Sequence, residues 1–212
     1  MSKASTFTLI YYCFISFALG QKVSNVNKVQ KSKLQITSNN LNKSINKYIP
    51  KGYQIFNKTV GNLNLDKIPD VILVINKIGE YKLNNPVPKR TLLILIGQTN
   101  GTFQLMCKND AIVFSHDMGG VSNPEPFDTI TIDEGYFTVK HFGGMGSFHW
   151  EREATFKYIA NENMFYLDKE VLDEGKESEI ESEIINGKKI LTTKDFGKLP
   201  FQKYNIYNRP ID

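Results

Sequence analysis

The stretch VGNLNLDKIPD, residues 60–70, carries oxygen-bearing groups at alternate positions. A tight turn can bring such groups to one point, and Ca²⁺ in proteins takes roughly six to eight oxygen ligands. The spacing therefore predicts a calcium loop, whose ligands are the side chains of Asn62, Asn64, Asp66 and Asp70 and the carbonyl of Ile68.

The same residues also fit a turn in which Asn and Asp side chains accept hydrogen bonds from the backbone. Only Asp66 and Asp70 supply negative charge, and Lys67 adds a positive one. Calcium affinity rises with ligand charge. We therefore expect a weak or vestigial calcium loop, with weakly bound calcium or no cofactor at all.

A second group of candidates surrounds the glycine-rich stretch HFGGMGSFHWER, residues 141–152. A small hydrolase could form a site between the 115–128 loop and the glycine-rich hairpin 141–149. That site would need His116, Asp117, Asp128 or His141 to converge in a cleft. Alternation places His141 on the same strand face as Phe137 and Val139, which favours a packed histidine.

Other catalytic patterns are missing from the sequence. It has no G-x-S-x-G stretch, no H-E-x-x-H and no Cys/His zinc spacing. Cys107 lies in FQLMCKN among apolar residues, which predicts a small core residue. We therefore assign no catalytic residue from the sequence.

The N-terminus has the layout of a secretory signal peptide. Lys3 precedes the uncharged apolar run FTLIYYCFISFAL, and small residues follow in ALG. This predicts a signal peptide over residues 1–20 and a mature chain starting near Gln21, exported to the periplasm or the extracellular space. The run is short for a membrane span, so no stable transmembrane anchor is expected after cleavage.

Composition limits the partner class. The formal net charge is +4, and the lysines are scattered rather than clustered with aromatics. Nucleic-acid binding therefore has little support. The 41% hydrophobic content is enough for a packed core.

The hydrophobic pattern predicts an α+β fold, mainly an antiparallel β meander with one N-terminal amphipathic helix. Residues 21–37 are polar and lysine-rich, which predicts a mobile leader. Leu41, Ile45, Tyr48 and Ile49 share one face of a predicted helix that ends at Pro50. DVILVINK and TLLILIG predict central strands, and AIVFS a short one. Asn100-Gly101 and Glu134-Gly135 predict hairpin turns, and GSFHWEREATFKYIA predicts a long strand with Trp150 on its core face.

From Asp173 the sequence becomes charged, in DEGKESEIESEIINGKK. This favours a solvated linker or an exposed helix. Aromatics return in FGKLPFQKYNIYNRPID, which could dock back as a strand. The predicted layout is one α+β domain over residues 38–170, followed by a charged linker and C-terminal segment over 171–212.

Two resemblances add to these patterns. Residues 61–70 and the following VILVI resemble an FG-GAP/VCBS-type calcium loop, GDLNxDGxxD before a buried strand; Gly61, Leu63, Asn64, Asp66 and Asp70 match, while Asn62 and Lys67 depart from it. IPKGYQIFNKTVGNLNLDKIPDVILVI, RTLLILIGQTNGTFQL and GYFTVKHFGGMGSFHWEREATFKY are together similar to a family of uncharacterised exported bacterial proteins. The second resemblance spans most of residues 41–170 and implies export and a fold rather than an activity.

The sequence thus predicts an exported, non-enzymatic domain. Its expected role is to bind a protein or glycan partner or to support the cell envelope. The alternative is a small secreted hydrolase with its site between the 115–128 loop and the glycine-rich hairpin.

Overall fold

The computed structural model describes residues 43–82, 87–121, 124–177 and 184–208. By its internal contacts the chain divides into two units, residues 1–46 and 47–212, and both sheets belong to the second unit. The predicted signal peptide, the leader and Leu41 lie outside the described residues.

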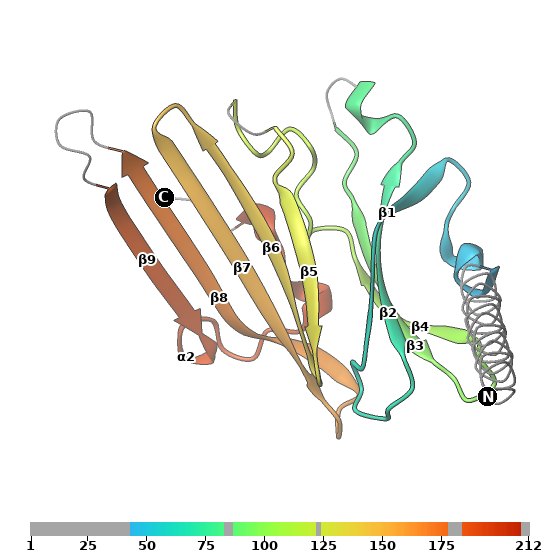
Figure 1. Cartoon of the computed structure of the whole chain (residues 1–212). Coiled ribbons are helices and arrows are strands. Elements are labelled where there is room, and N and C mark those ends of the chain that lie inside the picture. The colour runs from blue at the N-terminus through green and yellow to red at the C-terminus, as the bar shows by residue number, and fades with distance from the viewer. Residues whose placement is uncertain (1–42, 83–86, 122–123, 178–183, 209–212) are drawn as a thin grey trace, which may run out of the picture. The chain divides into compact units, whose positions relative to one another are not determined.

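The first sheet is a four-stranded antiparallel meander, β1 (Tyr53–Gly61), β2 (Asp70–Lys77), β3 (Thr91–Gly97) and β4 (Phe103–Asn109) (Figure 1). Its two apolar runs, β2 and β3, occupy the centre, and most of their residues are buried whichever face they point to, as their continuous hydrophobicity predicts. Asn100-Gly101 forms the predicted turn between β3 and β4, where Gly101 takes a φ of 76°.

The second sheet is a five-stranded antiparallel meander. It consists of β5 (Phe127–Asp133), β6 (Tyr136–Met145), β7 (Phe148–Ile159), β8 (Met164–Glu177) and β9 (Ile184–Thr192). β7 alternates as predicted, and Trp150 is 6% exposed in the core. The Glu134-Gly135 turn also forms, with Asp133 opposite Tyr136.

The mainly antiparallel β architecture is therefore confirmed. The helical part is small: residues 43–45 are helical and η1 (Asn46–Tyr48) is a 3₁₀ turn that ends before Pro50. The part of that predicted helix before residue 43, which includes Leu41, lies outside the described residues. Further short elements are η2 (Glu80–Lys82), α2 (Thr193–Phe196), η3 (Phe201–Lys203) and η4 (Ile206–Asn208).

Where the structure describes it, in residues 171–177 and 184–192, the charged stretch after residue 170 is strand rather than a separate linker or an exposed helix. β8 continues through Glu177 and β9 pairs with it, so this region belongs to the second sheet. The reason is that one face of an antiparallel sheet can be solvated. Leu172 points into the core, whereas Asp173 on the opposite face pairs with Lys188 of β9.

Residues 199–208 return to the core as predicted, but as 3₁₀ turns rather than as a strand. Their strand pairing is limited to one β-bridge, from Pro200 to Tyr166. Phe201, Tyr204 and Ile206 are buried in the shared core of both sheets. The predicted strand AIVFS is also wrong: residues 111–115 are buried but irregular, because their backbone bonds to this segment, for example Ile206 N–H to Ala111 C=O at 2.8 Å.

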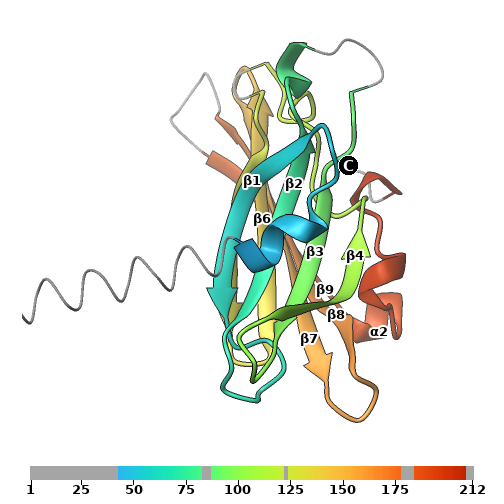
Figure 2. The ribbon, with the colours of Figure 1, turned by 90° about the vertical axis from the view of Figure 1, so that its right-hand side faces the viewer.

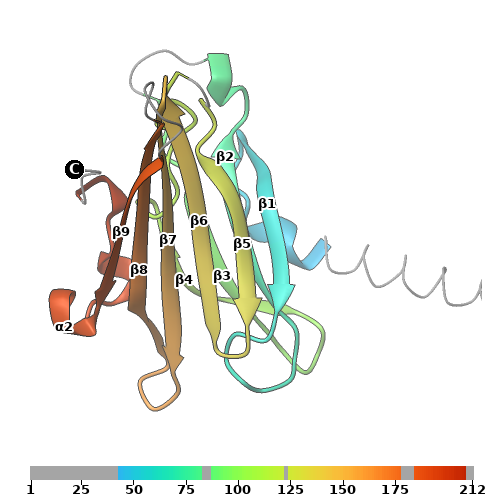
Figure 3. The same ribbon diagram turned by 60° about the vertical axis from the view of Figure 1, so that its left-hand side comes forward.

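Strand direction sorts the connections into two ends, visible at the top and bottom of Figure 3. The crossover end carries the described parts of two loops, residues 78–82 and 87–90 and residues 110–121 and 124–126, and the β6–β7 turn at residues 146–147. The hairpin end carries loop 62–69 and the turns at residues 98–102, 134–135 and 160–163. The predicted calcium loop and the predicted hydrolase loops therefore lie at opposite ends of the strands (Figure 2).

Candidate functional site

The predicted calcium loop closes around Asp70, the first residue of β2. Asp70 is fully buried, and its Oδ2 accepts from Leu63 N–H at 2.7 Å and from Asn64 N–H at 3.3 Å. Its Oδ1 accepts from Gly97 N–H of β3 at 2.9 Å. Burial raises the pKa of Asp70, and these backbone donors oppose the rise. Both oxygens of this carboxylate therefore accept hydrogen bonds from backbone N–H groups.

Asn64 and Asp66 shape the exposed part of the loop. Asn64 Oδ1 accepts from Asp66 N–H at 3.1 Å, and Asp66 Oδ1 accepts from Ile68 N–H at 2.8 Å. Leu65 and Lys67 take positive φ values of 70° and 69°. Lys67 thus adopts the left-handed conformation for which glycine is the usual residue. The loop keeps a tight turn even though that glycine is missing.

Asn62 joins the loop to the second sheet. Its carbonyl accepts from Gly135 N–H at 3.2 Å, and its Oδ1 is buried without a hydrogen-bond partner. Gly61 approaches Ile132 so closely that an added Cβ would collide with it. The loop therefore connects the two sheets at the hairpin end.

The five predicted ligand residues thus share one loop, but most of their side-chain oxygens already accept hydrogen bonds. A cation would have to compete with these bonds, and among the predicted side-chain ligand atoms Asn62 Oδ1 is the one that it could take without such competition. Within the described ranges, no group of three His, Cys, Asp or Glu residues could hold a metal ion. Calcium binding stays a prediction, and the present geometry is that of a turn.

The hydrolase candidates come together in part. Gly144 N–H donates to Gly119 C=O at 2.8 Å, so the 115–128 loop does lie against the glycine-rich strand end. His141, however, is 1% exposed, its Nε2 accepts from Phe114 N–H at 3.3 Å, and burial lowers its pKa to about 3. The packed histidine predicted from alternation is confirmed.

Asp128 is exposed, whereas Ser115, His116, Asp117 and Cys107 are engaged or buried. Ser115 Oγ donates to Asp117 at 2.6 Å, and the His116 ring packs on Tyr81 with centroids 4.9 Å apart. Cys107 is buried, and burial raises the pKa of its thiol to about 12. Such a thiol is inert at neutral pH.

A buried ion network, centred on Arg90, holds the crossover end together. Arg90 Nε donates to Glu80 Oε1 at 3.0 Å, and Nη2 also pairs with that oxygen, at 2.5 Å. Its Nη1 and Nη2 each donate to one oxygen of Glu125 at 2.6 Å. The guanidinium carbon lies 4.0 Å from the Phe56 ring centroid. Because Glu80 precedes β3 and Glu125 precedes β5, Arg90 joins loops of both sheets.

Each charged group in this network stabilises the ionised form of its partner. Burial alone would disfavour both ions, yet the hydrogen bonds to Glu125 and Glu80 raise the pKa of Arg90. Burial raises the pKa of Glu125, but the hydrogen bonds and charge of Arg90, together with the bonds from Phe127 N–H and the Tyr81 hydroxyl, outweigh burial and lower that pKa. Burying a guanidinium with carboxylates costs desolvation energy that pairing has to offset. Such an arrangement in surface loops marks the crossover end as a candidate functional site.

Tyr81 is an exposed residue whose hydroxyl is bonded to this network. Its ring is 60% exposed, while its hydroxyl donates to Glu125 Oε2 at 2.9 Å. Partial burial and this bond to Glu125 raise the pKa of Tyr81. Together with the contact to His116, they fix an aromatic ring in solvent at a defined position.

Sequence reasoning missed Glu80, Arg90 and Glu125. The partners of Arg90 lie 10 and 35 residues away in the chain, so no local pattern joins them. The available signal was weak: an arginine directly before an apolar strand start, where a buried charge needs a partner.

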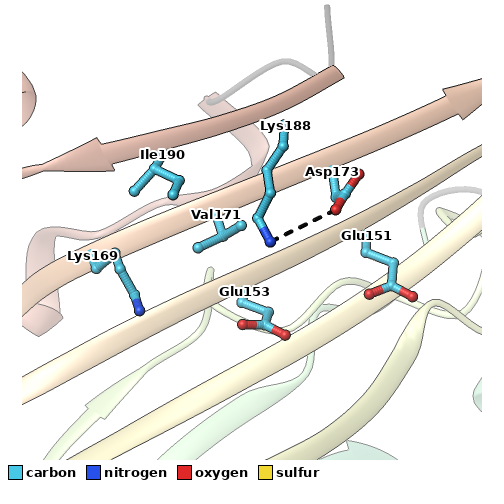
Figure 4. Close-up of a pocket in the computed structure, with 7 residues that line it drawn as sticks. All are labelled: Glu151, Glu153, Lys169, Val171, Asp173, Lys188 and Ile190. Carbon is cyan, nitrogen blue, oxygen red and sulfur yellow. Dashed lines mark ion pairs between the residues drawn. The ribbon is translucent and has the colours of Figure 1, made fainter. Parts of the chain in front are cut away.

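The outer face of the second sheet holds a polar groove of about 200 Å³ (Figure 4). It is lined by Glu151, Glu153, Lys169, Val171, Asp173, Lys188 and Ile190. Lys188 reaches Asp173 at 4.0 Å, and Lys140 lies 2.8 Å from Glu151. Several of its charges therefore have partners across the strands, as on a solvated sheet face.

Compared with known proteins, the chain matches no protein-family model, no curated protein and no solved structure. Across the part of the chain that the structure describes, no helix is long and apolar enough to cross a membrane.

Proposed function

We infer that this is an exported, non-enzymatic domain that binds a protein partner at its crossover end. The observation that carries the inference is Tyr81, an exposed aromatic ring fixed by a buried ion network. Tyrosine is enriched where proteins bind one another, and a preorganised side chain loses little entropy on binding.

The alternative hydrolase has less support. A general base has to reach its substrate directly or through one water molecule. His141 is enclosed by the core, and the Ser115 hydroxyl bonds to a carboxylate rather than to a histidine. The chemistry-bearing groups near the glycine-rich hairpin therefore serve packing, which favours a binding role.

A protein partner is favoured over a small ligand or glycan. Small-molecule sites are concave, mostly apolar and enclose their ligand. The groove of Figure 4 has a mainly charged lining with no aromatic residue. The crossover end instead offers exposed side chains on loops, which is the geometry of a protein contact.

Position-specific photocrosslinking in the producing cells tests the binding role. Ile78→p-benzoylphenylalanine and Met118→p-benzoylphenylalanine place the crosslinker at the crossover end, and Val60→p-benzoylphenylalanine, also exposed, is the control on β1. We expect discrete adducts from the first two positions and none from the control. Equal labelling from all three, or no adduct, would refute the binding site.

Export is tested separately. The positive start, apolar run and small residues before Gln21 support it. Intact mass of the protein from the exported fraction should correspond to a chain starting near Gln21. A retained Met1 would contradict export through this signal.

A further inference from the structure

The loop between β2 and β3 combines exposed apolar and basic side chains. Ile78 and Tyr81 are 59% and 60% exposed. Lys82 and Lys89 of the same loop and Lys77 at the end of β2 are also exposed. We refer to these five residues, Lys77, Ile78, Tyr81, Lys82 and Lys89, as the crossover strip.

The two acidic residues of the Arg90 network are already neutralised. Glu80 is buried against Arg90, and both oxygens of Glu125 accept from the same guanidinium. Neither carboxylate is available to pair with the three lysines. The strip therefore presents net positive charge around two apolar side chains, and a partner of opposite charge complements it.

We propose that the crossover strip binds a protein segment in which acidic residues flank an apolar side chain. The apolar side chain packs on Tyr81 and Ile78, and the flanking carboxylates pair with Lys82 and Lys89. Arg90 is a positioning residue, because its bonds to Glu125 and Glu80 hold the ring and the loop. This proposal names the partner chemistry of the proposed function and rests on it.

An anionic lipid surface is the competing occupant, and the charge pattern disfavours it. Asp110, Asp117 and Asp128 are exposed at the same end of the strands. A flat anionic surface would meet these carboxylates together with the lysines, whereas a peptide segment can contact the strip alone. Basic groups favour anionic membranes only where they dominate the facing surface.

The test uses the mature protein and three fluorescent peptides of equal length. One alternates Glu with Leu, one Glu with Ser and one Lys with Leu. Fluorescence anisotropy should show binding of the Glu/Leu peptide alone, weakened by added salt. Vesicles of phosphatidylglycerol and phosphatidylcholine form a fourth arm, in which we expect no binding.

Variants locate the contact. Lys82→Glu with Lys89→Glu should weaken Glu/Leu binding at least about tenfold, whereas the charge-matched pair Lys157→Glu with Lys194→Glu, away from the strip, should not. Tyr81→Phe keeps the ring and loses the bond to Glu125, so it should bind more weakly while unfolding like the wild type. Circular dichroism checks that each variant folds.

Three results would overturn the proposal: no peptide binding, equal binding of the Lys/Leu peptide, or vesicle binding that the Lys82 and Lys89 reversals abolish. The photocrosslinking experiment reports on the protein-binding role without any of these probes. A failure of the acidic-segment proposal is thus distinguishable from a failure of the proposed function.

Discussion

Replacing Asp70 by alanine should show whether the 62–70 loop is a structural turn. The substitution leaves the buried N–H groups of Leu63 and Gly97 without an acceptor. Each such orphan costs roughly 1–3 kcal/mol. The third bond, from Asn64 N–H at 3.3 Å, is long and only partly buried, so it adds little. Removing a buried carboxylate offsets part of this cost, and we expect a net loss of about 2–4 kcal/mol.

Urea unfolding in the presence of a chelator measures this loss without any contribution from calcium. Asp66→Ala is the matched control, because it removes a carboxylate from the same loop whose bonds are exposed. Its expected cost is below about 1 kcal/mol. Comparing the two variants distinguishes the loss of a buried carboxylate that accepts backbone hydrogen bonds from the loss of an exposed one.

The structural reasoning fails if Asp70→Ala costs less than about 1 kcal/mol, or if Asp66→Ala costs as much. Either result would mean that the loop does not depend on the backbone bonds of Asp70. A cost for both variants that appears only with calcium would instead establish a metal site.

Three further predictions concern the loop and the core. About 2 mM calcium should stabilise the wild-type protein by no more than about 0.6 kcal/mol in thermal unfolding, for a dissociation constant of ~1 mM; a large upshift that vanishes in Asp66→Ala would prove a calcium site. Trp150→Ala should cost about 3–5 kcal/mol in urea unfolding, and a loss below about 1 kcal/mol would show that its core assignment is wrong. The pKa of His141 is about 3 in the folded protein and 6.5 in the unfolded chain. Burial of the neutral ring therefore leaves the free energy of unfolding undiminished above pH 6.5, and this free energy falls as the pH drops towards 3, because the unfolded chain binds the proton more tightly. Over that window wild-type stability should fall by up to about 1.4 kcal/mol per pH unit more than that of His141→Gln, and parallel slopes would contradict this.

Local patterns were enough to predict most of the strands. The continuous apolar runs of β2 and β3 indicated buried central strands, and the alternation in β7 placed Trp150 inside. The Asn100-Gly101 and Glu134-Gly135 turns followed from residues that tolerate positive φ. These features depend on neighbours in sequence, which is why a single chain reveals them.

The remaining features depend on distant partners. β9 forms in a charged stretch because β8 offers it a ladder, and residues 111–115 stay irregular because Ile206 and Tyr207 bind their backbone. The spacing of Asn and Asp residues predicted the loop around Asp70. It did not predict that the Asp70 carboxylate accepts hydrogen bonds from backbone N–H groups. The Arg90 network joins residues up to 35 positions apart, beyond any local period.

The burial of Phe201, Tyr204 and Ile206 between the sheets has a consequence for the timing of folding. Strands β1 to β9 are all synthesised before these residues, so the shared core stays incomplete until the ribosome has passed position 206. Until then, the partly made chain exposes the apolar faces that this segment covers. The export proposed above requires an unfolded chain, and this delay in the final packing of the shared core suits it.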